Sequence, residues 1–389
     1  MWGGCFLEQF AQPSRKLVLS ADRKSTIVTF SQSLFCSACC GWLLASNGIQ
    51  AADNIIQTTS SRSVAPVAVD QNLSQDAPFL DLKFDRPFVP LVTGNGLDGW
   101  IVQEGKSTAW KRESDTIRCV SSAGGWLRTV EEYSDFVLRL EYRLQPGGNT
   151  GIGLRAPAEG NPTFTGIEIQ LLDDSAAKYA DLRADQYTGS VYYQVAATQK
   201  AKLHPANEWN RCEVRFIGDE LTVKINDEVV NQLRLNKPLQ NPDSQGEHHL
   251  SQRPPLGHLA LQSHSTQVDF RNIEIVDLTT QTSSGLRYVD LIPGLGNPVA
   301  ADSTVKLHYV GQLATGKRFT DTRDSGVPVQ VSLSELVSGL QQGIQGMKTG
   351  GRRRLVVPPQ LAYGEAGVPN SIPGNATLVF EVEVSEIVE

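Results

Sequence analysis

Short stretches in which apolar and polar residues alternate dominate the middle of the chain. Between Phe79 and Leu278 they recur as DFVLRLEYRL, GIGLRA, TGIEIQLL, CEVRFI, LTVKIND, GHLALQS and VDFRNIEIVDL, separated by Gly, Pro and Asn. A period of two indicates half-buried strands, and no helical pattern of normal length interrupts them. Many short strands without crossover helices predict one antiparallel sandwich or jelly roll over about 200 residues.

The last hundred residues show a different pattern. Thr304 to Gln312 alternates like a strand, and strand character returns at 352–357 and 377–388, with a long Pro- and Gly-bounded loop between these two. Ser334 precedes apolar residues spaced for one buried helix face, so a short helix is predicted from there to Ile344. An antiparallel sheet around one short helix is an α+β domain.

The first 78 residues lack this organisation. Arg23 and Lys24 precede an uncharged, moderately apolar stretch that ends in the small-residue exit Ile49-Gln50-Ala51-Ala52. This resembles a secretory signal with a long leader, and a buried helix or membrane anchor is the alternative. We therefore expect residues 1–52 to target the chain for export, to the periplasm or the cell exterior, with no stable membrane span after processing. Residues 53–78 are rich in Ser, Thr and Gln, which predicts a flexible linker.

Composition limits the partners. The chain has 389 residues, 40% of them hydrophobic, with a formal net charge of −7 and a pI near 5.5. This balance argues against nucleic acid or an anionic membrane as the main partner. The one basic run, 352–354, is predicted on a strand whose edge faces solvent. After removal of the first 52 residues only Cys119 and Cys212 remain, and we expect them to be unpaired core residues, with a disulfide as the alternative.

The blocks YVDLIPGLG, VKLHYVGQL, GKRF, GIQGM, GGRRRLVVPPQLAYG and IPGNATLVFEVEV follow one another over 288–389. In this order and spacing they resemble the FKBP family of peptidyl-prolyl isomerases (rotamases). The resemblance implies an FKBP-like domain over 287–389 that accelerates rotation about X-Pro bonds in proline-containing polypeptide clients, without cofactor or metal. It also implies the walls of an apolar pocket, which are Tyr309, Phe319, Val337, Tyr363 and Phe380, with Val329 and Leu340 as further lining. The implied donors to substrate carbonyls are the Ile372 backbone N–H and the Tyr363 hydroxyl.

The chain departs from the family pattern at three positions. Thr320 follows Phe319 where the family usually has Asp, and the acid Asp321 stands one residue later. Leu340 occupies the place of a common Trp, and Val329 that of a further aromatic residue. These changes predict a shallower, less polar pocket and put turnover in question more than the fold.

The blocks GLDGW, GGWLRTVEEYSDFVLRLEYRLQPGGNTGIGLRAP, YTGSVY, EWN and FRNIEI resemble the 3-keto-disaccharide hydrolase family, a concanavalin-like sandwich, over 79–278. The most polar strand, EIQLLDD, places Glu168 and Gln170 on one face and Asp173 on the other unless a bulge re-aims it. Glu168 with Asp173 would form a carboxylate pair for retaining hydrolysis only with such a bulge.

Cleavage of a 3-keto sugar does not need two carboxylates. The sugar's carbonyl acidifies the neighbouring C–H, so one base and one polarising donor suffice for elimination. Glu168 or His264 is the candidate base, and Arg155, Gln170 and Arg271 are candidate sugar contacts.

Residues 279–286 are predicted to be a short, exposed hinge. Two functions remain open. One is an exported prolyl isomerase whose sandwich binds or cleaves oligo- or disaccharides, and the other is a 3-keto-glycoside hydrolase with a non-catalytic FKBP-like module.

Overall fold

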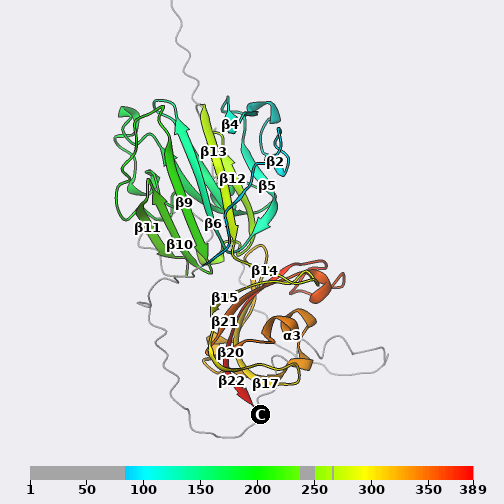
Figure 1. The fold of residues 1–389 in the computed structure, drawn as a ribbon. Coiled ribbons are helices and arrows are strands. Elements are labelled where there is room, and N and C mark those ends of the chain that lie inside the picture. The colour runs from blue at the N-terminus through cyan, green and yellow to red at the C-terminus, as the bar shows by residue number, and fades with distance from the viewer. Residues whose placement is uncertain (1–83, 237–249, 265–266, 389) are drawn as a thin grey trace, which may run out of the picture. The chain divides into compact units, whose positions relative to one another are not determined.

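Antiparallel sheets account for nearly all of the regular structure (Figure 1). The computed structural model describes residues 84–236, 250–264 and 267–388. The predicted signal (1–52) and linker (53–78) lie outside the described residues.

The larger sheet of the first domain contains eight strands, in the order β11-β10-β9-β6-β13-β4-β3, with β1 beside β13. Their bounds are β1 Val89–Pro90, β3 Trp110–Glu113, β4 Thr116–Cys119, β6 Phe136–Leu144, β9 Asn210–Ile217, β10 Glu220–Ile225, β11 Glu228–Arg234 and β13 Val268–Asp277. We call this sheet A.

A second sheet of five strands, sheet B, has the order β2-β5-β12-β7-β8. Its strands are β2 Trp100–Gln103, β5 Trp126–Tyr133, β7 Asn149–Ala156, β8 Ile167–Leu172 and β12 Gly257–Gln262. One short helix, α2 (Pro162–Thr165), connects β7 to β8 and is capped by the Asn161 side chain, which accepts from the Thr163 N–H. Because α2 immediately precedes β8, it brings side chains over the outer face of sheet B.

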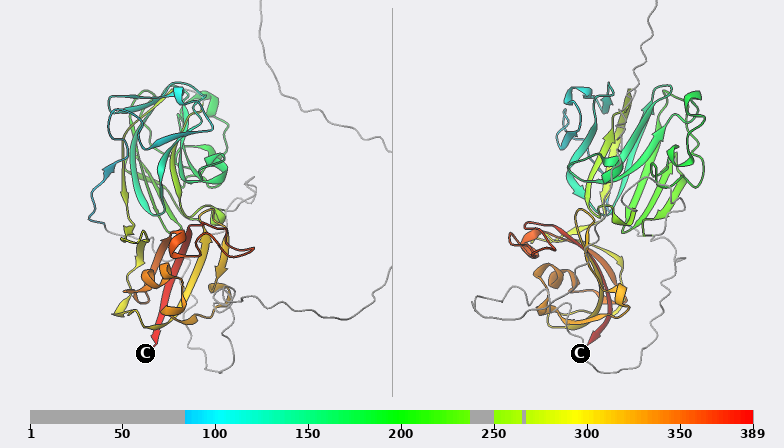
Figure 2. Two further views of the ribbon diagram at one scale, coloured as in Figure 1. Left: turned by 90° about the vertical axis from the view of Figure 1, so that its right-hand side faces the viewer. Right: turned by 180° about the vertical axis from the view of Figure 1, so that it is seen from behind.

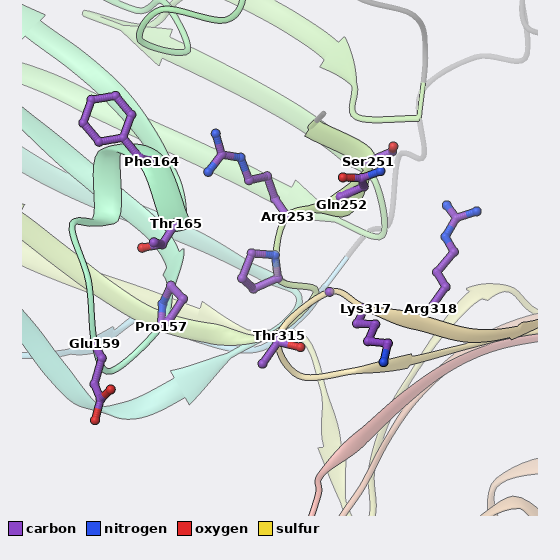
Figure 3. Close-up of a pocket in the computed structure, with 12 residues that line it drawn as sticks. Pro157, Glu159, Phe164, Thr165, Ser251, Gln252, Arg253, Thr315, Lys317 and Arg318 are labelled. Atoms are coloured by element: carbon purple, nitrogen blue, oxygen red, sulfur yellow. The ribbon is translucent and has the colours of Figure 1, made fainter. Parts of the chain in front are cut away.

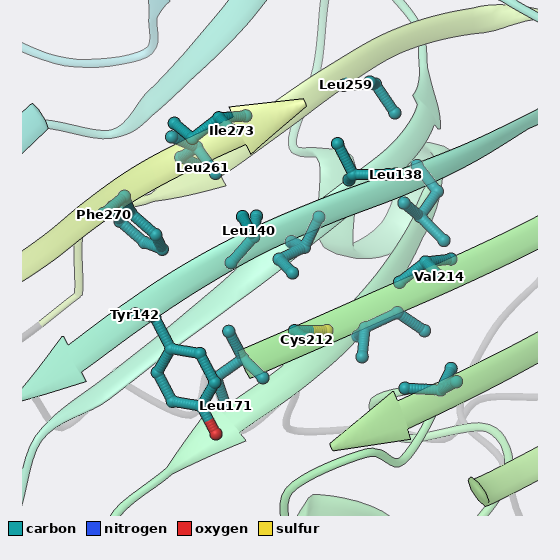
Figure 4. Packing of buried hydrophobic residues seen from close by; sticks show 14 of the residues in the cluster. Leu138, Leu140, Tyr142, Leu171, Cys212, Val214, Leu259, Leu261, Phe270 and Ile273 are labelled. Atoms are coloured by element: carbon teal, nitrogen blue, oxygen red, sulfur yellow. The ribbon is translucent and has the colours of Figure 1, made fainter. Parts of the chain in front are cut away.

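The core lies between sheets A and B, as the alternating pattern predicts. Figure 4 shows Leu138, Leu140 and Tyr142 of β6 packing toward side chains from sheet B such as Leu171 and Leu261. The predicted sandwich is therefore confirmed. Both Cys119 and Cys212 are buried and free in this core, so the unpaired interpretation is also confirmed.

The C-terminal domain is a seven-stranded antiparallel sheet around one helix, with the order β14-β15-β21-β22-β17-β18 and β19 beside β17 (Figures 1 and 2). Its elements are β14 Thr280–Gln281, β15 Arg287–Ile292, β17 Thr304–Leu313, β18 Arg318–Asp321, β19 Val329–Ser332, α3 Ser338–Ile344, β21 Arg352–Val357 and β22 Leu378–Val388, and β16 Leu295–Pro298 pairs separately with β20 Lys348–Thr349. The helix lies so close to β21 that a Cβ on Gly339 would be 2.3 Å from Val357 Cγ1. The predicted α+β domain is confirmed.

The predicted helix start is wrong by four residues. A 3-10 turn at Leu333–Glu335 comes first, held by a capping box between Ser332 and Glu335, and α3 begins only at Ser338. The capping signal therefore belongs to this turn rather than to the helix.

The basic run 352–354 is not a solvated edge. Its strand, β21, is internal to the sheet, and Arg353 and Arg354 are 8% and 6% exposed. Arg353 pairs with Asp290 (2.6 Å), and Arg354 with Glu381 (3.5 Å). Carboxylates therefore accompany both guanidinium groups, although Arg354 Nε and Nη1 are buried without a hydrogen-bond partner among the described residues.

The segment predicted as an exposed hinge is instead a partly buried hairpin. Thr280 and Gln281 of β14 pair with β15, and Thr279 is 7% exposed. Beside it, Val289 and Leu291 of β15 join a hydrophobic cluster with sandwich residues that include Val137 and Ile217. All described residues belong to one compact unit. Within the described residues no helix is long and apolar enough to cross a membrane.

Candidate functional site

A buried carboxyl group lies on the outer face of sheet B. Ile167, Ile169 and Leu171 of β8 point into the core, so Glu168 and Gln170 point to the opposite face, as predicted. Both are only 2% exposed. The Thr163 hydroxyl of α2 donates to Glu168 Oε2 at 2.5 Å. Burial raises the pKa of Glu168 to about 7, although the side chains of Thr163 and Gln262 lower it in part. A carboxyl with this pKa can accept or donate a proton near neutral pH.

Neighbouring strands leave room for this carboxyl. A Cβ on Gly151 of β7 would lie 2.2 Å from Glu168 Oε1, and a Cβ on Gly153 would lie 3.3 Å from a ring carbon of Trp126. The two glycines thus let the side chains of Glu168 and Trp126 lie directly against the backbone of β7. We call Glu168, Thr163, Gln170, Gln262 and Trp126 the Glu168 cluster.

Three of these residues were not predicted from the sequence. Gln262 stands one residue after the inward-facing Leu261 on β12, so strand alternation in GHLALQS carried a usable signal for it. Trp126 stands one residue before the inward-facing Leu127 on β5 and carried the same signal, whereas Thr163 gave none, because only the return of α2 over the sheet brings it to Glu168. The side-chain Oε1 of Gln262 is buried without a hydrogen-bond partner among the described residues.

Asp173 does not join Glu168. The pairing of β7 with β8 is regular from Asn149–Leu172 to Leu154–Ile167, so the bulge that a carboxylate pair required is missing from this ladder. Asp173 follows the end of β8, where its carboxylate accepts from the Gly147 N–H and the Ser175 hydroxyl, both at 2.7 Å. Burial would raise the pKa of Asp173, but these hydrogen bonds lower it overall. The condition that the sequence set for a Glu168–Asp173 pair is therefore not met.

Arg155 is a structural residue rather than a sugar contact. Its side chain is 2% exposed and donates to the carbonyl oxygens of Ser134 (2.7 Å) and Gly218 (3.0 Å). The guanidinium lies 3.4 Å from the centre of the Phe216 ring. Burial lowers the pKa of Arg155 to about 9. The prediction fails because the left-handed backbone at Arg155 (φ 48°) interrupts strand alternation.

Arg271 and His264 also lie outside the Glu168 cluster. Arg271 is on β13 of the other sheet, where it pairs with Glu141 (2.6 Å) and stacks 4.1 Å from the ring centre of Trp209. His264 is exposed beyond the end of β12. Glu168 is thus the candidate base that the structure places among buried polar groups. Within the described part of the chain, no group of three or more His, Cys, Asp and Glu side chains is arranged to bind a metal.

The predicted isomerase residues gather in one hydrophobic cluster of the C-terminal domain. Tyr309, Leu340, Ile372 and Phe380 are buried, and Phe319, Val329, Val337 and Tyr363 pack against them with part of their surface exposed. We call these eight residues the aromatic cluster. The Phe319 and Phe380 rings meet edge to face, 5.7 Å apart. A Cβ on Gly311 would lie 2.7 Å from the Phe319 ring, so β17 needs glycine there.

One predicted donor of this cluster is already used. The Ile372 N–H donates to the Val368 carbonyl at 2.9 Å, within the loop between β21 and β22, so the prediction that it binds a substrate carbonyl is wrong. By contrast, the Val337 N–H, immediately before α3, donates to no described residue. The first N–H groups of a helix lack intrahelical partners, so the Val337 N–H is a free donor at the cluster.

The hydroxyl of Tyr309 is buried without a hydrogen bond to any described residue. Burial raises the pKa of Tyr309 to about 12, and the nearby Thr320 side chain offsets part of this rise. The two hydroxyl groups are not in normal hydrogen-bond geometry. Asp321 does not replace the missing family acid. Its carboxylate accepts from the Arg323 N–H (3.0 Å) and pairs with Arg318 (3.3 Å).

Thr320→Asp is therefore expected to raise isomerase activity. A carboxylate at this position would accept from the buried Tyr309 hydroxyl, and a hydrogen bond worth about 0.5–1.5 kcal/mol corresponds to roughly a two- to tenfold change in kcat/KM. Asp321→Asn is the control and should change kcat/KM little. Unchanged or lower activity of Thr320→Asp in a peptide isomerisation assay would show that the acid is dispensable here.

Comparisons with known proteins match the sandwich and the C-terminal domain to two different families. Residues 87–276 match the family model of the 3-keto-alpha-glucoside-1,2-lyase-like domain, and residues 296–385 match that of the FKBP-type peptidyl-prolyl cis-trans isomerase. The chain carries one domain of each kind. Both resemblances found in the sequence are thus confirmed.

The relatives cover the FKBP-type domain. A probable FKBP-type peptidyl-prolyl cis-trans isomerase of Haemophilus influenzae is 42% identical over 106 residues, which are 27% of this chain and 44% of that protein. The isomerase FkpA of Escherichia coli K12 is 41% identical over 106 residues, 27% of this chain and 39% of that protein. The chain thus spans less than half the length of these relatives. For the lyase-like domain, a putative glycosyl hydrolase of Parabacteroides distasonis is 23% identical, with a TM-score of 0.45, and covers 50% of this chain and 100% of its own.

Proposed function

We propose that the FKBP-type domain is a peptidyl-prolyl cis-trans isomerase that acts on proline-containing polypeptides. The observation that carries this proposal is the aromatic cluster, in which the partly exposed Phe319 and Tyr363 pack against a core that contains Phe380 and Leu340. We infer that these side chains form an apolar pocket for the proline ring, and that the free Val337 N–H binds a substrate carbonyl.

The chemistry requires neither a nucleophile nor a metal. Rotation about the X-Pro bond is slow because it breaks amide resonance, with a barrier of about 18–20 kcal/mol. The twisted amide has lost much of its dipole, so an apolar site binds it better than the planar amide, and each ~1.4 kcal/mol of this difference is tenfold in rate. The test is a protease-coupled assay of the full chain on an X-Pro peptide. A chain that does not accelerate the reaction would favour a non-catalytic client-binding role.

A second function is proposed for the lyase-like domain, namely opening of the glycosidic bond of a 3-keto sugar. The buried Glu168, with a pKa of about 7, carries it. Its carboxylate would remove the proton from the carbon next to the ketone, and the electron pair would form a double bond as the glycosidic C–O bond breaks. The leaving alcohol takes up a proton, so atoms and charge balance. Donors such as Gln170 or Gln262 would polarise the ketone.

Export is proposed as the setting for both activities, on the basis of the signal-like segment 1–52. An antibody against the FKBP-type domain should find the protein outside the cytoplasm, and N-terminal sequencing should find a new end near Ala52 or Asp53. The same measurement on a chain in which a charged residue interrupts the apolar segment gives the control, since that chain should stay inside. A full-length cytoplasmic protein would contradict export.

A further inference from the structure

A guanidinium group without a partner lines a pocket outside both candidate sites. Arg253 follows the 3-10 turn Leu250–Gln252 and is 5% exposed. Its Nε and Nη1 atoms are buried, and neither forms a hydrogen bond with any described residue. Burial lowers the pKa of Arg253. Leaving a buried charge unpaired is costly, and native proteins pair such groups or use them to bind ligands.

The cavity beside Arg253 is large enough for a ligand. Its volume is about 630 Å³, within the usual range of small-molecule sites. Figure 3 shows the Arg253 side chain extending toward the side where Phe164 and Thr165 of α2 lie, with the turn between β17 and β18 across the opening. We call this cavity the Arg253 pocket.

The β17–β18 turn fits closely against the Arg253 segment. Gly316, at the tip of the turn, has φ +91°, and a Cβ there would lie 2.3 Å from the Gln252 carbonyl oxygen. Leu256 also shares a hydrophobic cluster with Val356 and Val379 of the FKBP-type domain. Closely packed backbone therefore forms one side of the pocket.

The lining combines cations, polar groups and one aromatic ring, with Glu159 as its one carboxylate. Arg253 supplies a buried cation, with the exposed Lys317 at the rim. Gln252 and Thr315 supply exposed amide and hydroxyl groups. The ring of Phe164 is 53% exposed, which is unusual for a large apolar side chain. A guanidinium binds a carboxylate through paired hydrogen bonds, polar side chains bind hydroxyl groups, and an aromatic face packs on the apolar face of a ring.

We propose that the Arg253 pocket binds an acidic sugar, a saccharide unit that bears one carboxylate. The carboxylate pairs with Arg253, the sugar ring packs on Phe164, and the hydroxyl groups contact Gln252 and Thr315. This site is separate from the Glu168 cluster and from the aromatic cluster, so it does not depend on either proposed activity.

The test is calorimetric titration of the full chain with sodium D-glucuronate. D-glucose has the same ring without the charge, and acetate has the charge without the ring. Each should bind at least about tenfold more weakly than glucuronate, because each lacks one of the two recognised features. Equal binding of glucose, no binding of glucuronate, or tighter binding of a peptide through its C-terminal carboxylate would overturn the proposal.

Two substitutions locate the binding. Arg253→Gln should weaken glucuronate binding at least tenfold, while its thermal stability stays the same or rises, because a buried unpaired charge is removed. Phe164→Ala changes an exposed side chain and should weaken binding several-fold even if Arg253→Gln fails to fold. Lys348→Gln changes an exposed lysine of β20 that does not line the pocket, and it is the charge control, with less than a threefold effect. Unchanged binding in both Arg253→Gln and Phe164→Ala would place any glucuronate elsewhere.

Discussion

Phe319→Ala is expected to lower kcat/KM for X-Pro isomerisation by about 10- to 100-fold. The Phe319 ring packs edge to face on Phe380 and is partly exposed, so it is placed to cover a bound proline ring. Burial of a Phe side chain is worth about 1.5–3 kcal/mol, and the same free energy withheld from the transition state gives this loss in rate. The measurement is the protease-coupled assay on the full chain.

Leu295→Ala serves as the control for this prediction. Leu295 is 82% exposed on β16 and belongs to no described hydrophobic cluster, so its removal should leave kcat/KM within about twofold. Tyr363→Phe offers a graded comparison, because it removes only one hydroxyl and should cost tenfold or less. If Phe319→Ala keeps full activity, the aromatic cluster is not the proline site.

Glu168→Gln is expected to reduce cleavage of a 3-keto disaccharide by about 10²- to 10⁴-fold, the usual contribution of a positioned general base. The amide keeps the shape of the carboxyl group but cannot take a proton. Wild-type activity should rise as the pH passes about 7, because the base must be ionised. Asp173→Asn is the matched control, since the structure places Asp173 in a separate hydrogen-bonded loop. Full activity of Glu168→Gln would remove Glu168 from the mechanism.

The same variant has a consequence for stability. The pKa of Glu168 is raised from 4.5 to about 7 in the folded protein, so between these values the folded state holds a proton that the unfolded state releases. The stabilisation of the folded state by the protonated Glu168 carboxyl is complete below about pH 4.5 and is lost as the pH rises through about 7. From pH 5 to pH 8 the wild type should lose about 2–3 kcal/mol relative to Glu168→Gln, measured by urea denaturation. Parallel curves would mean that Glu168 titrates normally.

Local sequence determined the elements and much of the candidate sites. Period-two alternation fixed which residues of β8 face the core, and hence that Glu168 and Gln170 share the outer face. The ordered motifs of the last hundred residues named eight residues that the structure places in one hydrophobic cluster. Both results depend on spacing along one strand or on side-chain identity, which a sequence states directly.

Tertiary structure decided what each polar group contacts. Arg155 lies in a strand pattern, yet its left-handed backbone turns it onto the Ser134 and Gly218 carbonyls in the core. The Ile372 N–H is used by Val368, four residues earlier in the same loop. The strand that carries Arg353 and Arg354 is internal only because β15 and β22 flank it.

The unpaired state of Arg253 has the same origin. Its sequence, Gln-Arg-Pro-Pro, predicts only a loop, and burial comes from packing between α2 and the turn after β17. Whether a charge is solvated, paired or left for a ligand depends on groups far away in the chain. Sequence therefore determined the strands and the chemical types present, whereas only the tertiary structure decided which of those groups remain free to bind, because desolvation and pairing are set by distant neighbours.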